Sequence, residues 1–369
     1  MRILFTGGGT GGHIFPLIVV KRKIELMLKS NFRKIDFEFL GSGSVEKDIF
    51  LKEKIATRKL IGVKWRRYFS IKNFVDILKL PIVLFQAFYN VWAYMPDIIF
   101  SKGGPGSFFV VIAGWLYRIP IVIHESDSVP GITNKLSSPF SKKIAISFEE
   151  AKKFFPKRKT VLTGTPIRQK VLLGSKEKAK EIFKLTGDRK IIFIMGGSQG
   201  AKEINSIFVD VINKYIEKYE ILHMCGEKNF KDLNLLTKGI LREKQRTFYH
   251  LLPFLNEEEM GHAYAAADVV LARAGSGTIF EIAATEKPSV IVPLKKGAQD
   301  HQAKNAYNFT KTGAGTVIEE TNITPNFVFG RVSQVASSEK NSKRMKEACR
   351  KFARPNAASE VAKIIINIA

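Results

Sequence analysis

The chain has 369 residues, of which 45% are hydrophobic and 25% charged, and its net charge is +25. This length exceeds what one ordinary hydrophobic core serves, so we expect two domains. The composition is typical of a soluble globular protein. The two cysteines, Cys225 and Cys349, favour a reducing compartment over a disulfide-stabilised fold.

The apolar segments are too short or too interrupted to cross a membrane. The longest, 81–96, contains Gln86 and Asn90 and falls short of the ~20 residues that a spanning helix needs. At the N-terminus a short apolar run leads directly into glycines, which is not the pattern of a secretory signal peptide. We therefore expect a cytoplasmic protein.

Short apolar runs alternate with helical patterns along the chain, which predicts an α/β protein. Most runs are continuous rather than alternating, as in strands that are buried on both faces of a parallel sheet. The predicted strands are 3–6, 35–40, 98–101, 121–124, 143–146, 161–163, 191–195, 220–225, 247–251, 269–272 and 289–292.

An internal repeat indicates that one architecture is built twice. Segments 97–107 and 268–278 share an aspartate, an apolar run, a base, two glycines and a hydroxyl residue at identical spacing. We expect domains at 1–163 and 164–345, separated by a Gly-Thr-Pro turn. The C-terminal helical segment, 346–369, is expected to join the first domain.

The glycine-rich turn at 7–12 lies between a predicted strand and a predicted helix, an arrangement that suits phosphate binding. Its spacing matches the dinucleotide fingerprint, but the next strand ends in Leu40-Gly41-Ser42 instead of the required acidic residue. It is not a P-loop, because His13 stands where lysine is needed. A neutral His13 at the start of a helix could act as a general base or simply cap the helix.

Other motifs also allow a functional and a structural interpretation. Ser198, in a second glycine turn, could bind a diphosphate or belong to a plain strand-to-helix turn. Arg168 could pair with phosphate or lie on the surface. Glu281 completes a capping box with Thr278, and could instead accept hydrogen bonds from ribose hydroxyls. Polar groups gather at 124–127, after a strand, and at 299–302, before a helix.

In order and spacing, these motifs resemble those of the MurG family of bacterial peptidoglycan glycosyltransferases. The segments that carry the resemblance are 7–13, 124–125, 164–168, 196–201, 275–281 and 300–305. The resemblance implies the GT-B fold, in which two Rossmann-like, doubly wound parallel-sheet domains face a deep cleft. It also implies inverting transfer of N-acetylglucosamine from UDP-GlcNAc to the MurNAc 4-hydroxyl of undecaprenyl-pyrophosphoryl-MurNAc-pentapeptide (lipid I), which forms lipid II.

The resemblance further implies residue roles, with His13 or Asp127 as the catalytic base. Arg168 and Ser198 would contact the donor phosphates, Glu281 the ribose, Leu255 the uracil and Gln302 the sugar hydroxyls. The full set expected to contact UDP-GlcNAc is Thr10, Gly11, Gly12, Asp127, Arg168, Ser198, Leu255, Ser276, Gly277, Thr278, Ile279, Phe280, Glu281 and Gln302. No metal or other cofactor is expected.

One segment departs from the family pattern. Members often carry Glu-Gln-Asn where this chain has Glu125-Ser126-Asp127. A sugar contact made by an asparagine amide would therefore fall to Asp127, whose ionised carboxylate can only accept hydrogen bonds. Asp127 could instead position or deprotonate the acceptor hydroxyl.

Basic and aromatic residues are interleaved over 64–92. By themselves they are compatible with a solvated face, a nucleic-acid site or a membrane-binding surface. The family resemblance implies the last of these, with reversible binding to the anionic cytoplasmic face of the inner membrane. It also implies other cell-wall synthesis and division proteins as partners, and no nucleic acid.

Three other functions stay open. Another nucleotide-sugar enzyme, such as a diacylglycerol glucosyltransferase or a UDP-GlcNAc epimerase, would share the architecture. A dinucleotide-dependent oxidoreductase is disfavoured by the missing ribose carboxylate. A nucleic-acid binder is disfavoured because the chain has no such module motif and the glycine turns would have no purpose.

Overall fold

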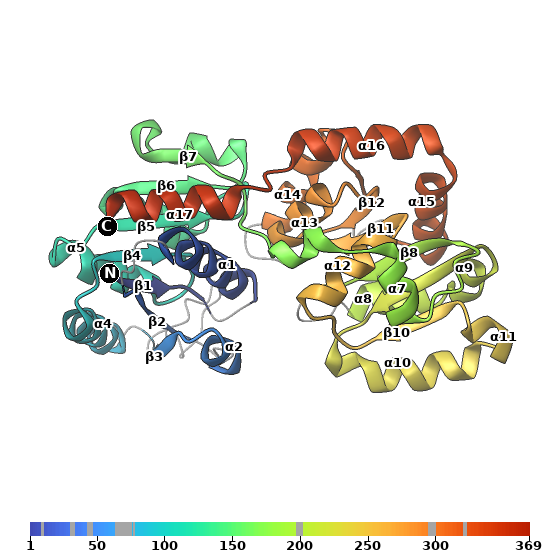
Figure 1. Ribbon diagram of the computed structural model, residues 1–369, viewed down its shortest axis with the longest axis horizontal. Coiled ribbons are helices and arrows are strands. Elements are labelled where there is room, and N and C mark those ends of the chain that lie inside the picture. Colours follow the sequence, from blue (N-terminus) through green and yellow to red (C-terminus); the bar gives the residue numbers. More distant parts are fainter. Residues whose placement is uncertain are drawn as a thin grey trace. The chain divides into compact units, whose positions relative to one another are not determined.

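The computed structural model describes residues 1–8, 11–29, 34–42, 47–62, 76, 78–196, 202–293, 300–319 and 323–369. The chain forms two compact units, each built on one parallel sheet (Figure 1). Unit 1 comprises Met1–Ile167 and Pro355–Ala369, and unit 2 comprises Arg168–Arg354. No helix within the described ranges has both the length and the apolar character needed to cross a bilayer.

Unit 1 contains a seven-stranded sheet in the order β3-β2-β1-β4-β5-β6-β7, with every neighbouring pair parallel. Its strands are β1 (Arg2–Thr6), β2 (Asp36–Ser42), β3 (Ala56–Leu60), β4 (Ile98–Ser101), β5 (Ile121–Glu125), β6 (Lys143–Ile146) and β7 (Thr160–Leu162). Its helices are α1 (Gly11–Leu28), α2 (Lys47–Lys52), α4 (Leu80–Tyr94), α5 (Ser107–Leu116), α6 (Ile132–Ser137), η2 (Ser138–Phe140), η3 (Glu149–Phe154), η4 (Lys157–Lys159) and α17 (Ala357–Ile368).

Alternating side chains of β1 bind the two helical layers of unit 1 to its sheet. Ile3 and Phe5 belong to one apolar cluster with residues of α1 and α17. Leu4 points to the other face, because successive side chains of a strand alternate, and packs in a cluster with α4 and α5. Both faces of the sheet are thus covered, which explains why the central strands are continuous apolar runs.

Unit 2 contains a six-stranded parallel sheet in the order β10-β9-β8-β11-β12-β13. Its strands are β8 (Lys190–Met195), β9 (Tyr219–Met224), β10 (Tyr249–Leu252), β11 (Val269–Arg273), β12 (Ser289–Val292) and β13 (Thr316–Val317). Its helices are η5 (Gln169–Leu173), α7 (Lys176–Phe183), α8 (Lys202–Val209), α9 (Ile212–Lys218), α10 (Glu227–Ile240), α11 (Glu243–Arg246), α12 (Glu257–Ala266), α13 (Ser276–Ala284), α14 (His301–Thr310), α15 (Pro325–Ser337) and α16 (Glu339–Phe352).

The two sheets are wound alike, which confirms the predicted α/β class with two doubly wound parallel sheets. In each, the strand order reverses beside the first strand, between β1 and β4 in unit 1 and between β8 and β11 in unit 2. Ligands of open α/β sheets bind outside the carboxyl ends of the strands at this reversal. The fold therefore directs attention to the turns that follow these strands.

The aspartates of the internal repeat perform the same task in each unit. Asp97 Oδ2 accepts a hydrogen bond from the backbone nitrogen of Arg2 at 2.7 Å, and Asp268 Oδ2 accepts one from Ile191 at 2.8 Å. The backbone nitrogens of the two aspartates donate in return to the carbonyls of Arg2 and Ile191. Each aspartate thus aligns the start of the first strand of its unit.

Candidate active site

The turns after β1 and β4 approach each other at the strand reversal of unit 1. Gly104 has a φ of +93°, and an added Cβ there would lie 2.8 Å from the backbone nitrogen of Gly8. Only glycine permits this contact without strain. The helix α1 begins next, at Gly11 and Gly12, and its unpaired N–H groups and positive dipole end favour an anion.

His13 lies in the first turn of α1 and is partly buried. A Cβ on Gly8 would lie 2.9 Å from His13 Nδ1, so the turn before α1 lies close against the imidazole. Burial and the nearby Lys102 ammonium lower the pKa of His13 to about 4, although the Asp127 carboxylate opposes them. His13 is therefore neutral at pH 7 and can accept a proton.

Lys102 follows β4 and is a buried cation, with 3% of its surface exposed. Its Nζ donates a hydrogen bond to His124 Nδ1 at 2.7 Å and another to Ser126 Oγ. His124 Nε2 lies 3.0 Å from the carbonyl of Gly164, so this nitrogen is the one that donates. Burial lowers the pKa of Lys102 to about 8, although two neighbouring carboxylates favour its charge. The ammonium form still predominates at pH 7.

Glu125 holds the turn that carries Asp127. Its Oε1 accepts from the backbone nitrogen of Asp127 at 2.9 Å, and its Oε2 accepts from Gly131 N at 3.1 Å and Asn134 Nδ2 at 2.8 Å. Burial and the Asp127 carboxylate raise the pKa of Glu125 to about 7, against these hydrogen bonds and Lys102. Glu125 is thus engaged in positioning the backbone.

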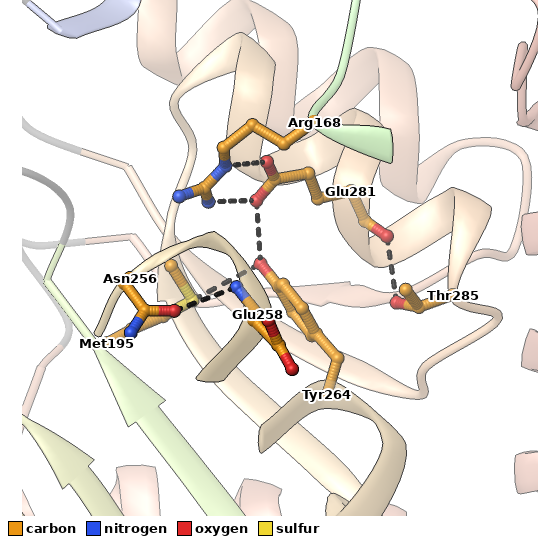
Figure 2. Close-up of polar contacts among 7 residues, drawn as sticks. All are labelled: Arg168, Met195, Asn256, Glu258, Tyr264, Glu281 and Thr285. Atoms are coloured by element: carbon orange, nitrogen blue, oxygen red, sulfur yellow. Dashed lines mark hydrogen bonds and ion pairs between the residues drawn. The ribbon is translucent and has the colours of Figure 1, made fainter. Parts of the chain in front are cut away.

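In unit 2, Arg168 and Glu281 form a buried two-pronged ion pair (Figure 2). Arg168 Nε lies 2.8 Å from Oε1 of Glu281, and Nη2 lies 2.9 Å from Oε2. The side chains are 11% and 7% exposed, respectively. Burial opposes the charge of Arg168, but the Glu281 carboxylate outweighs it, and the pKa of Arg168 is raised. The sequence did not predict this pairing.

Tyr264, from α12, completes this cluster. Its hydroxyl lies 3.4 Å from both Glu281 Oε2 and Met195 Sδ, and Met195 is the last residue of β8 (Figure 2). Burial and Glu281 raise the pKa of Tyr264 well above its ordinary value, so the phenol remains a hydrogen-bond donor. The cluster thus adjoins the carboxyl end of β8, at the strand reversal of unit 2.

The predicted nucleotide turn forms the start of α13, which begins at Ser276. Gly277 is exposed and Thr278 partly so, whereas Ile279 and Phe280 are buried in the core. The Phe280 ring packs 5.1 Å from that of Phe352, measured between centroids. Any ligand at this turn would therefore contact the backbone of Ile279 and Phe280 and not their side chains.

The remaining predicted residues are dispersed. Leu255 is buried just before α12, and Gln302 is partly exposed in the first turn of α14. Thr10 and Ser198 lie outside the described residues, as do residues 64–75 and 77 of the basic and aromatic stretch 64–92. Among the residues that the structure describes, no group of three or more His, Cys, Asp or Glu side chains is placed to hold a metal ion.

Sequence reasoning overlooked Lys102 as a candidate site residue. The available signal was the internal repeat, where Lys102 aligns with Arg273. Arg273 is buried at the end of β11 and reaches the carbonyls of Val292 and Pro293, at and just beyond the end of β12, at 3.4 and 3.3 Å. Lys102 likewise reaches from the end of β4 to His124 in β5. Both units therefore bury a cation at the same place in the fold.

Comparisons with known proteins agree over nearly the whole chain. Residues 3–146 match the glycosyltransferase family 28 N-terminal domain, and residues 191–361 match the family 28 C-terminal domain. The chain is 37% identical over 353 residues, 95% of each chain, to a UDP-N-acetylglucosamine--N-acetylmuramyl-(pentapeptide) pyrophosphoryl-undecaprenol N-acetylglucosamine transferase of Bacillus thuringiensis subsp. konkukian.

Two further relatives agree with this assignment. A transferase with the same description in Clostridium kluyveri is 36% identical and is covered over 92% of both chains. The crystal structure of Acinetobacter baumannii MurG superposes with a TM-score of 0.74, at 25% identity and 99% coverage of both chains. The chain therefore belongs to the MurG family of glycosyltransferase family 28.

Proposed function

We propose that this chain transfers N-acetylglucosamine from UDP-GlcNAc to the MurNAc 4-hydroxyl of lipid I, producing lipid II. The observation that carries the proposal is the similarity, over 95% of both chains, to a relative whose name states this donor and this acceptor. A neutral imidazole in unit 1 and a buried arginine–carboxylate cluster in unit 2 supply the chemistry that such a transfer needs.

In this proposal unit 2 holds the donor. Arg168 and Ser198 contact the diphosphate, the turn Ser276–Phe280 surrounds the nucleotide, and Glu281 accepts from the ribose hydroxyls. Leu255 lies beside the uracil, and Gln302 binds the sugar hydroxyls. The Arg168–Glu281 pair supports this arrangement, because a guanidinium for phosphate and a carboxylate for ribose already lie side by side.

Unit 1 supplies the proton acceptor. His13 takes the proton of the 4-hydroxyl as the oxygen attacks the anomeric carbon, and the bond from that carbon to the UDP oxygen breaks with inversion. Arg168, Ser198 and a helix N-terminus stabilise the charge that develops on UDP. Thr10, Gly11 and Gly12 lie near the diphosphate and the acceptor. Asp127 is the second candidate for the base, and its carboxylate can also accept from a sugar hydroxyl.

The decisive experiment incubates the purified chain with radiolabelled UDP-GlcNAc and lipid I. The expected product is a lipid-linked disaccharide. A labelled product formed with diacylglycerol instead, or epimerised UDP-sugar formed without acceptor, would replace the proposal by one of the rival nucleotide-sugar activities. If no product forms under conditions in which the Acinetobacter relative is active, the proposed function is wrong.

We also propose that unit 1 binds the anionic cytoplasmic face of the membrane, where the lipid acceptor would be met. The helix α4 has no charged residue, and its two amide side chains, Gln86 and Asn90, lie on one side of it. Val83, Ala87 and Val91 are buried, whereas Phe85 and Trp92 on the opposite side are 71% and 59% exposed. Large apolar side chains that are exposed together on one face of a helix mark a binding surface.

Further exposed apolar side chains lie on the neighbouring helix α5. The helices α4 and α5 pack together through the rings of Phe88 and Tyr117, whose centroids are 5.8 Å apart. Trp115 at the end of α5 is exposed, and the exposed bases Arg118 and Lys135 lie after α5 and on α6. Apolar rings flanked by bases are suited to an anionic lipid surface. Failure to sediment with anionic vesicles at low salt would overturn this proposal.

A further inference from the structure

We propose that Lys102 is a positioning residue of the transfer reaction, whose buried ammonium holds the Ser126–Asp127 segment in place and sets the charge that His13 faces. The inference rests on the proposed function, because it assigns a task to Lys102 within that reaction. Nothing in the sequence motifs or in the relatives' names assigns a role to this residue.

The inference is supported first by the hydrogen-bond partners of the buried Lys102 ammonium. A buried lysine must be compensated by polar partners, because removing an ammonium from water is costly. Lys102 finds them in one short stretch of chain, donating to His124 Nδ1 at 2.7 Å and to Ser126 Oγ. His124 is anchored in turn by the carbonyl of Gly164. The residue after Ser126 is Asp127, so the ammonium fixes the segment that carries this carboxylate.

The second support is the charge around His13. The groups that act on it are Lys102, from the end of β4, and Asp127, from the turn after β5. Those that act on Lys102 are Glu125 and Asp127, and its hydrogen-bond partners are His124 and Ser126. Lys102 thus interacts both with the candidate base and with the carboxylates. Its positive charge disfavours the imidazolium, which keeps His13 able to accept a proton.

The third support is the contrast with the equivalent residue of unit 2. Arg273 reaches backbone carbonyls at the end of β12 and an exposed carboxylate of Glu203 in α8, so it braces the sheet and a helix. Lys102 instead donates to the side chains of His124 and Ser126, and Ser126 belongs to the segment that departs from the family pattern, Glu125-Ser126-Asp127. A carboxylate at position 127 adds a negative charge, and the Lys102 ammonium offsets it.

The test compares wild type with Lys102→Met, which keeps the length of the side chain and removes its charge. Two quantities are followed against pH: kcat/KM of the transfer, and the ring proton signal of His13 by NMR without substrate, assigned with His13→Gln. We expect the acid limb of kcat/KM and the pKa of His13 both to move upward by about one pH unit. We expect kcat at pH 8 to fall about tenfold, with the KM for UDP-GlcNAc nearly unchanged.

Two further variants separate charge from packing. Lys102→Gln removes the charge but can still donate to Ser126, so it should show the same pH shift even if Lys102→Met folds poorly. Ser126→Ala keeps the ammonium and should leave the acid limb in place. Thermal melting of each variant serves as the folding control.

The outcomes are distinct. If both Lys102 variants leave the acid limb and the His13 titration unchanged, the inference is wrong and Lys102 only supports the fold. If wild type forms no lipid-linked disaccharide, the proposed function fails, whereas the NMR titration still reports whether Lys102 acts on His13.

Discussion

The two units share the order of their first six strands and a buried cation at the end of the fourth strand, yet their polar clusters differ in kind. In unit 1 the Lys102 ammonium is bound by neutral partners, His124 and Ser126. In unit 2 Arg168 is locked to the Glu281 carboxylate. In the first arrangement, burial and the ammonium keep a nearby imidazole neutral against the Asp127 carboxylate. The second is neutral overall and offers a phosphate ligand beside a ribose ligand.

One scaffold thus supports two kinds of chemistry through the residues at its strand ends. The repeat conserves what aligns the strands, as the aspartates at 97 and 268 show. The residues that face the proposed ligands differ between the two units. Substitutions in the two units should therefore change different measured quantities, and the following experiments test this expectation.

The largest effect is expected from His13→Ala in unit 1. Removal of a general base typically lowers the rate 10²- to 10⁴-fold, so we expect a loss of about that size in kcat with saturating donor and acceptor. The affinity for UDP-GlcNAc should change little, because His13 is not among the residues proposed to hold the donor. Asp127→Asn, assayed in parallel, identifies the base as the residue with the larger loss. Intact saturating turnover in His13→Ala would exclude it.

In unit 2, Glu281→Gln should destabilise the fold by about 3–5 kcal/mol, because it removes the carboxylate charge that is paired with the buried Arg168 guanidinium. It should also raise the KM for UDP-GlcNAc. The matched control is Glu286→Gln, which breaks a two-pronged pair of similar geometry with Arg350 whose side chains are 35% and 67% exposed. We expect little change there. Urea unfolding measures both, and equal losses would contradict the role of burial.

A smaller effect is expected at the surface of α4 that is proposed to bind the membrane. Phe85→Ser should weaken binding to anionic vesicles about tenfold, because the ring contributes apolar area to the α4 face. Phe254→Ser is the control, since Phe254 is an exposed ring of unit 2. Sedimentation with vesicles compares the two. If both variants bind equally well, the lipid contact lies elsewhere.

The smallest effect is expected from substitution of the two aspartates of the internal repeat. Asp268→Ala should cost about 1–2 kcal/mol of unfolding free energy through loss of the hydrogen bond to Ile191. Asp97→Ala removes the equivalent bond, but Asp97 is more exposed, so its loss should be smaller. Neither variant should alter the KM for UDP-GlcNAc. A larger loss at Asp97 would show that the units depend on their aspartates differently.

Much of the fold can be predicted from the sequence, because buried parallel strands are continuous apolar runs. The strands that it did not predict, β3 and β13, lie at the edges of their sheets. β3 contains Arg58, whose guanidinium pairs with Glu38 of β2 at 2.8 Å. Because this residue is charged, β3 is not a continuous apolar run and does not match the pattern of a buried strand. β13 has only two residues, too few for any periodic pattern to emerge.

Only those residues of the candidate site that belong to a local sequence pattern could be predicted. The glycine turn and the helix start place His13 without any knowledge of distant contacts. The Arg168–Glu281 pair joins residues that are 113 positions apart, and no local pattern encodes such a partner. Lys102 and His124 are 22 positions apart on neighbouring strands, and only the repeat hinted at the lysine.

The packing of α17 in unit 1 also sets an order of events during synthesis. Val361, Ala362 and Ile365 share an apolar cluster with Ile14 and Leu17 of α1, so residues from both ends of unit 1 complete one core. A ribosome makes all of unit 2 before the segment that closes unit 1 emerges. Unit 2 can therefore finish folding first, although it is encoded second. Until then unit 1 carries an open apolar seam along α1.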